Sequence, residues 1–232
     1  FIVDEAHHFE ETAEQHLGTV VHYYGVTHIL TQLYKDANSG LLPALTHTLQ
    51  TAGSAAERDE WTSLIHIQAE RVVELKQAWD ELAAVIYGKL AETAGAAESG
   101  VWTKRLRAEA KQASDWETVR VLEDNFYVLA SDIMRELHER VHTVLDKEED
   151  STLQGLLTDL NGELKQLTDV RDALRFVLHA EQDDHVYWME AQAPANVNSL
   201  RLTAVPIDVS PLLQQYFFDA KESVVLTSAT LT

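Results

Sequence analysis

The chain has 232 residues, of which 45% are hydrophobic, and its formal net charge is −20 because 38 Asp and Glu outnumber 18 Lys and Arg. This length suits one large domain or two small ones, and no apolar run reaches the about 20 residues that a membrane-spanning helix needs. So many acids predict weak DNA binding by the chain itself, since nucleic-acid affinity depends on neutralising phosphates. The lack of Cys excludes disulfides, thiolate zinc sites and Cys-ligated iron–sulfur clusters from these residues.

The two ends of the chain both read as strands of one sheet. The apolar residues 1–3 are followed by Asp4-Glu5-Ala6-His7, which predicts a buried strand with two carboxylates at its C-terminal end, the edge where α/β sheets bind ligands. Residues 223–232 form a second apolar strand that ends in small hydroxyl residues. The long middle is then an insertion between two strands. Because the chain starts in mid-strand and without Met, we expect a piece of a longer protein, cytoplasmic in location as the lack of Cys suggests.

After the first strand, residues 8–16 have helical spacing and Gly18 is a plausible stop. Residues 19–24 are rich in β-branched and aromatic side chains, which predicts a strand. Helical periodicity follows around residues 29–34, is broken at 38–40 and resumes in a short helix over 41–50.

Three long amphipathic helices are predicted next, over residues 54–92, 115–147 and 151–179. Each carries apolar side chains at three-and-four spacing, and the polar segments between them are short. This pattern predicts an antiparallel bundle with the apolar stripes in its core.

A small β element closes the insertion. Residues 185–190 and 200–205 both read as strands and are expected to pair as a hairpin. Ser210-Pro211 then starts a short helix, with Ser as the cap and Pro in the first turn, before the terminal strand.

Chemistry is expected where the two end strands stop. An acid at a strand end holds Mg²⁺ through water in P-loop NTPases, which suits Asp4, and an adjacent Glu such as Glu5 can polarise the attacking water. A strand holds such groups in place, so they need no reorganisation during the reaction. Hydroxyl groups within residues 227–230 can hydrogen-bond His7 and report the state of the nucleotide.

Here the chain resembles the DinG/XPD-like group of superfamily 2 DNA helicases. Residues 3–7 (VDEAH) match motif II of that group, and residues 225–231 (VLTSATL) match motif III. The runs 186–190 (VYWME) and 204–210 (AVPIDVS) are similar to bacterial DinG-type proteins. In this family a mostly helical arch domain is inserted between motifs II and III of the first RecA-like domain, which is the layout deduced above from the strands and helices.

The resemblance implies a mainly α chain: an antiparallel bundle of long helices with a small β element, plus two strands of a RecA-like P-loop NTPase sheet. It assigns residues 1–18 and 199–232 to RecA-like domain 1 and residues 19–198 to the arch. The implied activity is ATP-dependent 5′→3′ translocation on single-stranded DNA, with the arch helping to form the DNA pore.

The same resemblance assigns roles and cofactors. Asp4 would bind Mg²⁺ through water and Glu5 would activate water, so both belong to the ATP site. His7, Ser228 and Thr230 would couple hydrolysis to movement. The iron–sulfur cysteines of the family, where present, lie upstream of motif II. Some DinG-type relatives carry an exonuclease domain and act as nucleases, which these residues do not decide.

Part of the machinery is missing from the sequence. No G-x-x-x-x-G-K-[ST] phosphate loop occurs, and no second RecA-like domain supplies an arginine finger. We therefore expect ATP and Mg²⁺ to serve only a full-length parent enzyme, and this chain alone neither to hydrolyse ATP nor to bind it tightly. The oligomeric state, the preferred DNA structure and the protein partners stay open.

One basic patch stands out in the acidic chain. It consists of Lys104, Arg105, Arg107 and Lys111, with Trp102 and Trp116 nearby. Phosphate pairing combined with base stacking would make it a contact for single-stranded DNA. The alternative is a solvated loop whose positive charges pair with the excess of acids.

Two rival functions come from other classes. His138-Glu139-Arg140-Val141-His142 matches H-E-x-x-H on a predicted helix, the spacing that zinc hydrolases use for two ligands and a general base. A zinc site needs a third ligand as well, and flanking histidines of a bundle helix explain the match equally. The other rival is a stand-alone helical interaction module whose end motifs are coincidental.

Overall fold

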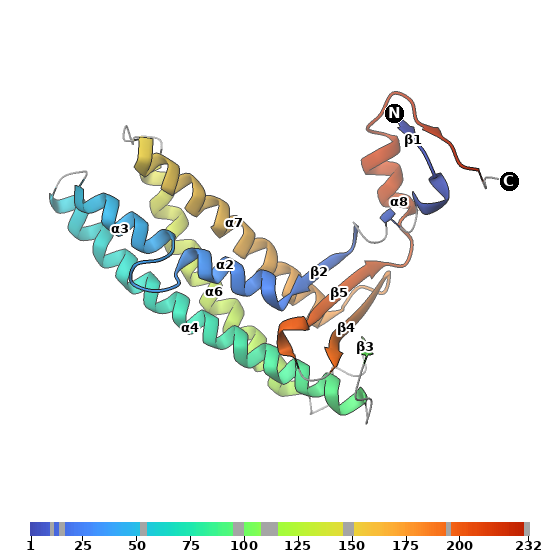
Figure 1. The fold of residues 1–232 in the computed structure, drawn as a ribbon, viewed down its shortest axis with the longest axis horizontal. Helices are drawn as coiled ribbons and strands as arrows, with labels where there is room; N and C mark the ends of the chain where they lie inside the picture. The colour runs from blue at the N-terminus through green and yellow to red at the C-terminus, as the bar shows by residue number, and fades with distance from the viewer. Residues whose placement is uncertain are drawn as a thin grey trace.

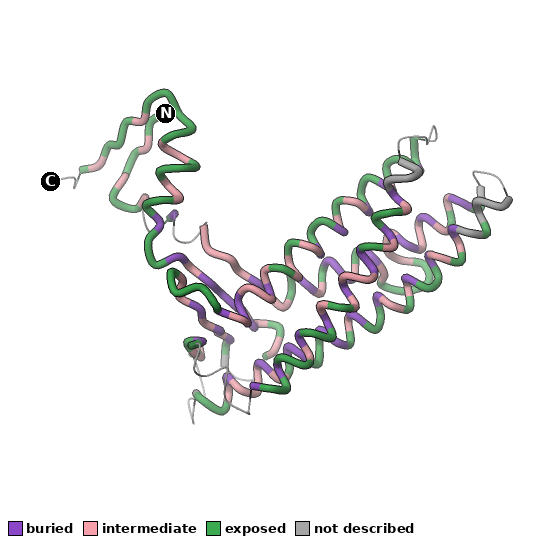
Figure 2. The backbone as a smooth tube through the Cα atoms, turned by 180° about the vertical axis from the view of Figure 1, so that it is seen from behind, coloured by how far each residue is buried: buried purple, intermediate pink, exposed green. Residues whose placement is uncertain are grey.

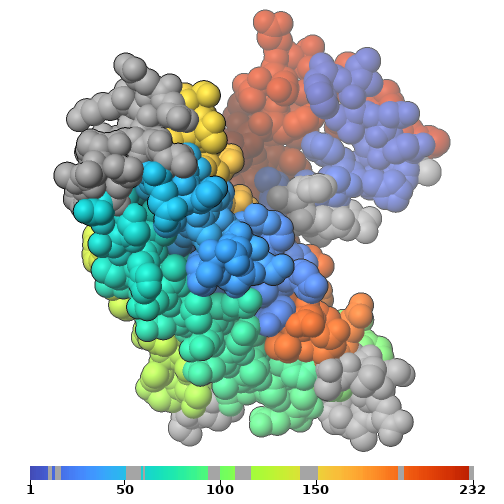
Figure 3. Space-filling model, turned by 60° about the vertical axis from the view of Figure 1, so that its left-hand side comes forward, coloured from blue at the N-terminus to red at the C-terminus, as the bar shows by residue number. Residues whose placement is uncertain are grey.

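The computed structural model describes residues 1–9, 12–13, 17–51, 55–94, 100–107, 116–145, 151–193 and 196–229. A long helical body ends in a four-stranded sheet, and beyond that sheet the two ends of the chain come together (Figure 1). We call residues 1–9 and 207–229 the terminal module. Figure 3 shows this module standing apart from the helices in the space-filling view. The mainly α fold class is confirmed.

The helical body is built on the three long helices that the sequence predicts. They are α4 (Ala55–Ala94), α6 (Glu117–Leu145) and α7 (Ser151–His179). Helix α6 packs against both α4 and α7. The predicted bounds agree to within a few residues, because the apolar stripes end where the polar connecting segments begin.

Two shorter helices occupy the fourth position of the bundle. α2 (Tyr23–Leu33) and α3 (Leu41–Thr51) follow one another along the groove between α4 and α7, and both helices contact both neighbours (Figure 1). The fourth helix is therefore split by the turn at 34–40, which the sequence marks with Asn38-Ser39-Gly40. Tyr23 already belongs to α2, so the predicted strand over 19–24 ends two residues earlier.

The turn between α2 and α3 depends on Gly40. Its φ of 119° lies in the region that favours glycine, and a Cβ there would come within 2.9 Å of the Leu33 carbonyl oxygen and the Tyr34 Cα. Backbone bonds close the turn: the Lys35 N–H donates to the Ser39 carbonyl oxygen at 2.9 Å. This tight geometry lets α3 continue along the bundle after α2 has ended.

The core is aromatic where the helices cross. The Trp79 ring stacks against Tyr23 of α2 with ring centres 5.8 Å apart, and it meets Phe126 of α6 at 5.9 Å. Trp79 and Phe126 are fully buried, and leucines of α7 such as Leu174 complete the same cluster. Figure 2 shows buried residues running along the inner side of the bundle and into the sheet.

One carboxylate is buried between α6 and α7. Glu123 is 2% exposed and accepts hydrogen bonds from Arg175 Nε at 2.8 Å and from Arg175 Nη2 at 3.3 Å. His179 Nε2 lies 3.2 Å from the same carboxylate. Arg175 also lies over the Tyr127 ring, 3.5 Å from its centre. The buried charge is thus fully paired, which avoids the large cost of an unpaired ion.

The sheet has the strand order β2-β5-β4-β3 and is antiparallel throughout. Its strands are β2 (Thr19–His22), β3 (Gly100–Leu106), β4 (His185–Ala193) and β5 (Arg201–Pro206). The predicted pairing of the last two is confirmed, with Met189 opposite Leu202. The interpretation of the basic patch as a solvated loop is wrong for Lys104 and Arg105, which lie in β3 where it pairs with the outer edge of β4; Arg107 follows the strand, and Lys111 lies outside the described residues.

The chain enters and leaves the helical body through adjacent strands. β2 leads in, β5 leads out, and the two pair from Thr19↔Ala204 to His22↔Arg201. Although β5 lies within residues 199–232, which we expected to return to the RecA-like domain, it belongs to the sheet of the helical body. The terminal module resumes after β5.

In the terminal module, β1 (Ile2–Val3) pairs in parallel with β6 (Val225–Leu226). A 3₁₀ turn (Ala6–His8) follows β1, and α8 (Ser210–Leu213) continues as a π-helical turn over Gln214–Phe218. The predicted helix over 8–16 lies largely outside the described residues. None of the described helices is long and apolar enough to cross a membrane.

Two glycines in the helical body offer a matched test of the α2–α3 turn. Gly40→Ala should lower the free energy of unfolding by about 1–3 kcal/mol, because alanine is strained at positive φ and its Cβ meets backbone. Gly88→Ala in α4 should raise it by about 0.5–1 kcal/mol, because its Cβ points into open space and alanine favours the helix. Urea unfolding of both variants measures this, and a harmless Gly40→Ala would show that the turn tolerates a side chain.

Candidate functional site

The two sequence motifs meet on adjacent parallel strands. Ile2 lies opposite Val225 and Val3 opposite Leu226. The Thr227 N–H donates to the Val3 carbonyl oxygen, and the Ala6 N–H donates to the Thr227 carbonyl oxygen, both at 2.9 Å. Because the strands are parallel, both motifs emerge at the same edge, as ligand sites of α/β sheets require.

Asp4 is held as an ionised carboxylate at this edge. Its Oδ1 accepts a hydrogen bond from the Thr227 hydroxyl at 2.7 Å and another from the Glu5 N–H at 3.0 Å. The Thr227 hydroxyl, and after it the Glu5 N–H, lower the pKa of Asp4 below its ordinary value of 3.8. Both bonds use one oxygen, so Oδ2 stays directed to a ligand or water.

The backbone bends sharply directly after Asp4. Glu5 adopts a left-handed conformation with φ 53° and ψ 42°, which is uncommon for a residue with a side chain. The bend starts the 3₁₀ turn that carries His7. Glu5 itself is 60% exposed along its side chain, so its carboxylate is open to solvent.

His7 connects the two motifs through its side chain. Its Nδ1 lies 2.8 Å from Ser228 Oγ and 3.2 Å from Glu5 Oε2, so one ring nitrogen touches both the hydroxyl and the second carboxylate. His8 stacks on the His7 ring with centres 3.9 Å apart. A change at the Glu5 carboxylate can therefore reach Ser228 through His7, whereas Asp4 contacts Thr227 directly. Thr230 lies outside the described residues.

The donor set suits a hydrated Mg²⁺ that is shared with a phosphate ligand. Mg²⁺ usually binds one or two carboxylates, several waters and substrate phosphates, not a closed protein cage. Asp4 supplies one ionised carboxylate with a free oxygen. Within the described ranges, no three His, Cys, Asp or Glu side chains gather as a complete metal site. The remaining ligands would come from water and phosphate.

This edge of the molecule is open. Ile2 is 72% exposed and Val225 52% exposed, although both belong to apolar strands. Phe1 and Phe9 contact Phe217 at ring-centre distances of 5.3 and 5.0 Å, which gives the module a small aromatic cluster of its own. Figure 2 shows the terminal module mostly exposed or half-buried, unlike the bundle.

The proposed DNA-binding patch does not lie on one surface, because β3 alternates. Trp102 and Lys104 face the helices: the Trp102 ring lies 5.8 Å from that of Tyr87, and Lys104 Nζ donates to the Lys89 carbonyl oxygen at 3.4 Å. Arg105 points to the opposite side of the sheet and is exposed, as is Arg107. Lys111 lies outside the described residues, and Trp116 is buried in the core.

The H-E-x-x-H match lies on the flank of α6. His138 and Glu139 are exposed, and Arg140 lies over the Trp61 ring at 5.4 Å. The side chain of His142 is outside the described part of the chain. Exposed positions beside the apolar stripe are those that flanking residues of a bundle helix occupy.

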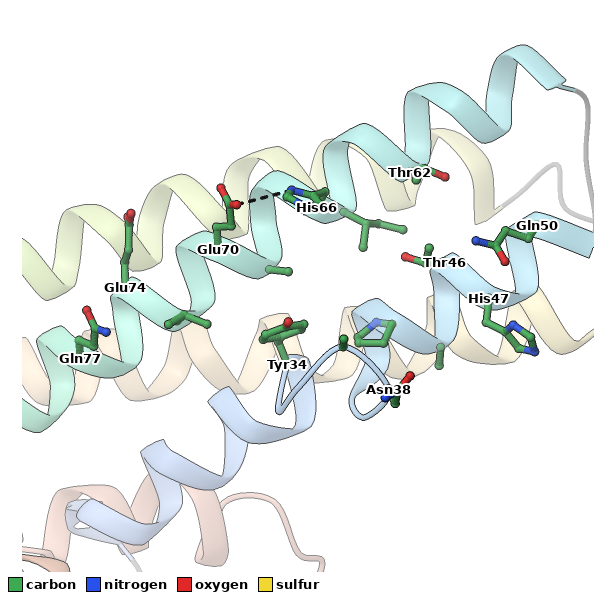
Figure 4. Close-up of a pocket in the computed structure, with 16 residues that line it drawn as sticks. Tyr34, Asn38, Thr46, His47, Gln50, Thr62, His66, Glu70, Glu74 and Gln77 are labelled. Atoms are coloured by element: carbon green, nitrogen blue, oxygen red, sulfur yellow. Dashed lines mark ion pairs between the residues drawn. The ribbon is translucent and has the colours of Figure 1, made fainter.

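A groove of about 1150 Å³ lies between α3 and α4, at the end of the body far from the terminal module (Figures 1 and 4). Its lining includes the apolar Ile65 and Val73 and polar side chains such as His66, which pairs with Glu70 at 3.7 Å. None of the residues expected to carry chemistry lines it.

Thr227 is the site residue that the sequence reasoning missed. It stands first in the run of hydroxyl residues at 227–230, but only the strand register shows that it bonds Asp4 while Ser228 bonds His7. Alternation along a strand is the signal that distinguishes them, since neighbouring side chains point to opposite sides.

The whole chain is similar to a known protein of greater length. The chain is 28% identical over 245 aligned residues to the 3'-5' exonuclease DinG of Bacillus subtilis (strain 168), and the alignment covers 100% of this chain and 24% of that protein. The chain thus spans about a quarter of the length of this relative. No family model matches the chain.

Thr227→Val tests the arrangement at Asp4. Removal of the hydroxyl should raise the pKa of Asp4 toward its ordinary value, because the largest cause of its lowering is gone. A carboxyl with a lowered pKa in the folded state stabilises that state above its ordinary pKa and loses this contribution as pH falls, so the variant should lose stability at neutral pH and differ least below pH 3.8. Carbon-detected NMR titration measures the pKa.

Ser228→Ala is the matched control, since its hydroxyl contacts His7 and not Asp4. The pKa of Asp4 should be unchanged in this variant. An equal rise in both variants would mean that the strand end, not the Thr227 hydroxyl, sets the pKa.

Proposed function

We propose that this chain is the motif II to motif III segment of a longer DinG-like, ATP-dependent DNA helicase. The carrying observation is that two matched motifs, 221 residues apart, meet on neighbouring parallel strands through the bond between His7 and Ser228. The similarity to a DinG protein over the whole chain supports the same proposal. The aligned part is 24% of that protein, as expected for one segment of a longer enzyme. A coincidence of two separate strand ends does not explain this contact.

In this proposal, each side chain at the edge has a separate task. The Asp4 carboxylate would hold Mg²⁺ through water, with its orientation set by the Thr227 hydroxyl. Glu5, exposed beside it, would orient the water that attacks the γ-phosphate and accept its proton. The metal, when bound, would supply charge neutralisation for the phosphate oxygens. His7 then transmits the change at Glu5 to Ser228 and, in the proposal, to Thr230.

The helical body would act as the arch of such an enzyme. Because β2 and β5 pair side by side, the body can be inserted between two neighbouring strands of an ATPase sheet without separating them. We place the boundaries of the insertion at the outer ends of these two strands. The proposed task of the arch is to help enclose single-stranded DNA during 5′→3′ translocation.

A second candidate function has its own observation. The relative is named as a 3'-5' exonuclease. A whole protein of this type would degrade single-stranded DNA, with ATP hydrolysis at the Asp4 edge regulating the process. Digestion of a 3′-labelled oligonucleotide by the longer protein, with and without ATP, separates this candidate from a helicase that displaces a strand intact.

Glu5→Gln in the longer protein tests the proposed function. DNA-stimulated ATP hydrolysis should fall by about 10²–10⁴-fold, because the amide cannot accept the proton of the attacking water. ATP binding should persist, since Asp4 and Thr227 are untouched. Phosphate release and binding of a fluorescent ATP analogue measure the two effects.

Glu70→Gln, at an exposed position on α4 in the helical body, is the control and should keep activity. The 232-residue chain alone should show no hydrolysis, because it lacks a phosphate loop. Magnesium-dependent ATPase activity in that chain, or full activity in Glu5→Gln, would contradict the proposal.

A further inference from the structure

The outer face of the four-stranded sheet carries an aromatic side chain at its centre. The helices cover one face, where Tyr187, Met189 and Leu202 are buried. Trp188 in β4 points to the other side and is half-buried. Its register partners are Arg105 in β3 and Thr203 in β5. Such partners have Cβ atoms about 5 Å apart, so Trp188 lies directly between an arginine and a threonine.

This face is basic within an acidic chain. Arg105 is exposed on one side of Trp188, and Arg201 follows on β5, 40% exposed along its side chain. The same face carries one acid, Glu190. Its carboxylate pairs with Arg201 at 3.4 Å and accepts a hydrogen bond from the Trp188 indole N–H at 3.2 Å. That bond fixes the indole along the strand. Arg107 continues the positive side beyond β3.

Two polar atoms on this face lack partners in the described structure. They are Thr203 Oγ1 and Arg201 Nε, both buried. Nearly all buried polar atoms in proteins have a hydrogen-bond partner, so two neighbouring residues with unsatisfied atoms on one half-buried face need an explanation. Arg201 Nε itself is inaccessible, so a phosphate would have to contact the exposed remainder of this side chain. Glu190 contacts Nη1.

We propose that this face binds single-stranded DNA, with one base stacked on the Trp188 indole and the neighbouring phosphates contacted by Arg105 and Arg201. A flat aromatic ring beside Arg105, with Arg201 on the same face, suits a strand whose bases are unpaired and whose backbone is charged. The sheet face thus replaces the patch expected from the sequence, in which Lys104 turns toward the helices. The proposal rests on the proposed function only in naming DNA as the polynucleotide.

Fluorescence anisotropy of labelled dT20 with the 232-residue chain at low salt tests the face. Trp188→Ala should weaken binding about tenfold through lost stacking. Arg105→Glu should weaken it by a similar factor, and Arg105→Ala should reduce the slope of log affinity against log salt by about 0.7, the value for one phosphate contact on a single strand. Because Arg105 is exposed on an edge strand, its variants decide the question if Trp188→Ala unfolds.

Matched controls lie elsewhere on the body. Tyr24→Ala removes an aromatic ring that is 69% exposed on α2, and Arg135→Glu reverses a charge that is 58% exposed on α6. Both should bind dT20 like the wild type. The proposal is overturned if the wild-type chain does not bind, if the sheet variants match the controls, or if polyglutamate competes as well as dT20, which would indicate a site for anions in general.

The proposed function can fail separately. Trp188-dependent binding of dT20, together with a longer protein that hydrolyses no ATP, would refute the helicase and leave this face intact. If Glu5→Gln abolishes ATP hydrolysis but the Trp188 and Arg105 variants bind dT20 like the wild type, the helicase proposal stands and the DNA-binding face is refuted.

Discussion

The pairing of β2 with β5 is the contact on which the rest of the architecture depends. It joins the strand that leads into the helical body to the strand that leads out, from Thr19↔Ala204 to His22↔Arg201. Once these strands are paired, the loop that must close to bring β1 and β6 together shrinks from the whole insertion to the short connections on either side. Loop-closure entropy then favours the β1–β6 contact by roughly 1.5–2 kcal/mol. A parallel pair of only two residues on each strand is too small to offset the entropy of closing the whole insertion as one loop.

The β2–β5 pairing lies between two parts of the chain that differ in how much apolar surface they bury. The helical body and its sheet share one continuous core, from Trp79 and Phe126 to Tyr187 and Met189. The terminal module has a few aromatic contacts and exposed apolar strands such as Ile2 and Val225. We infer that the module is completed by further strands of the proposed longer enzyme. The residues proposed to carry chemistry thus lie on the more exposed part of the chain, while the insertion has a core of its own.

The site edge is organised by hydrogen bonds more than by burial. Thr227 and the Glu5 N–H hold Asp4, and His7 links Glu5 with Ser228. The left-handed backbone of Glu5 turns the chain so that both acids and the histidine share one edge. Loss of the single Thr227 hydroxyl would therefore change the environment of Asp4. The register between β1 and β6 determines which hydroxyl reaches Asp4 and which reaches His7.

The long helices and the β4–β5 hairpin follow from local apolar spacing, because that spacing distinguishes a helix from a strand and shows which face is buried. Acids and hydroxyls after apolar strands are local patterns as well, and they predict a site at the two chain ends. Three relations appear only in the folded chain: α2 and α3 share one position in the bundle, Thr227 and not its neighbours bonds Asp4, and Trp188 lies between Arg105 and Thr203. These relations depend on register between strands far apart in the chain. A one-residue shift would reverse every side chain, and no local pattern records it.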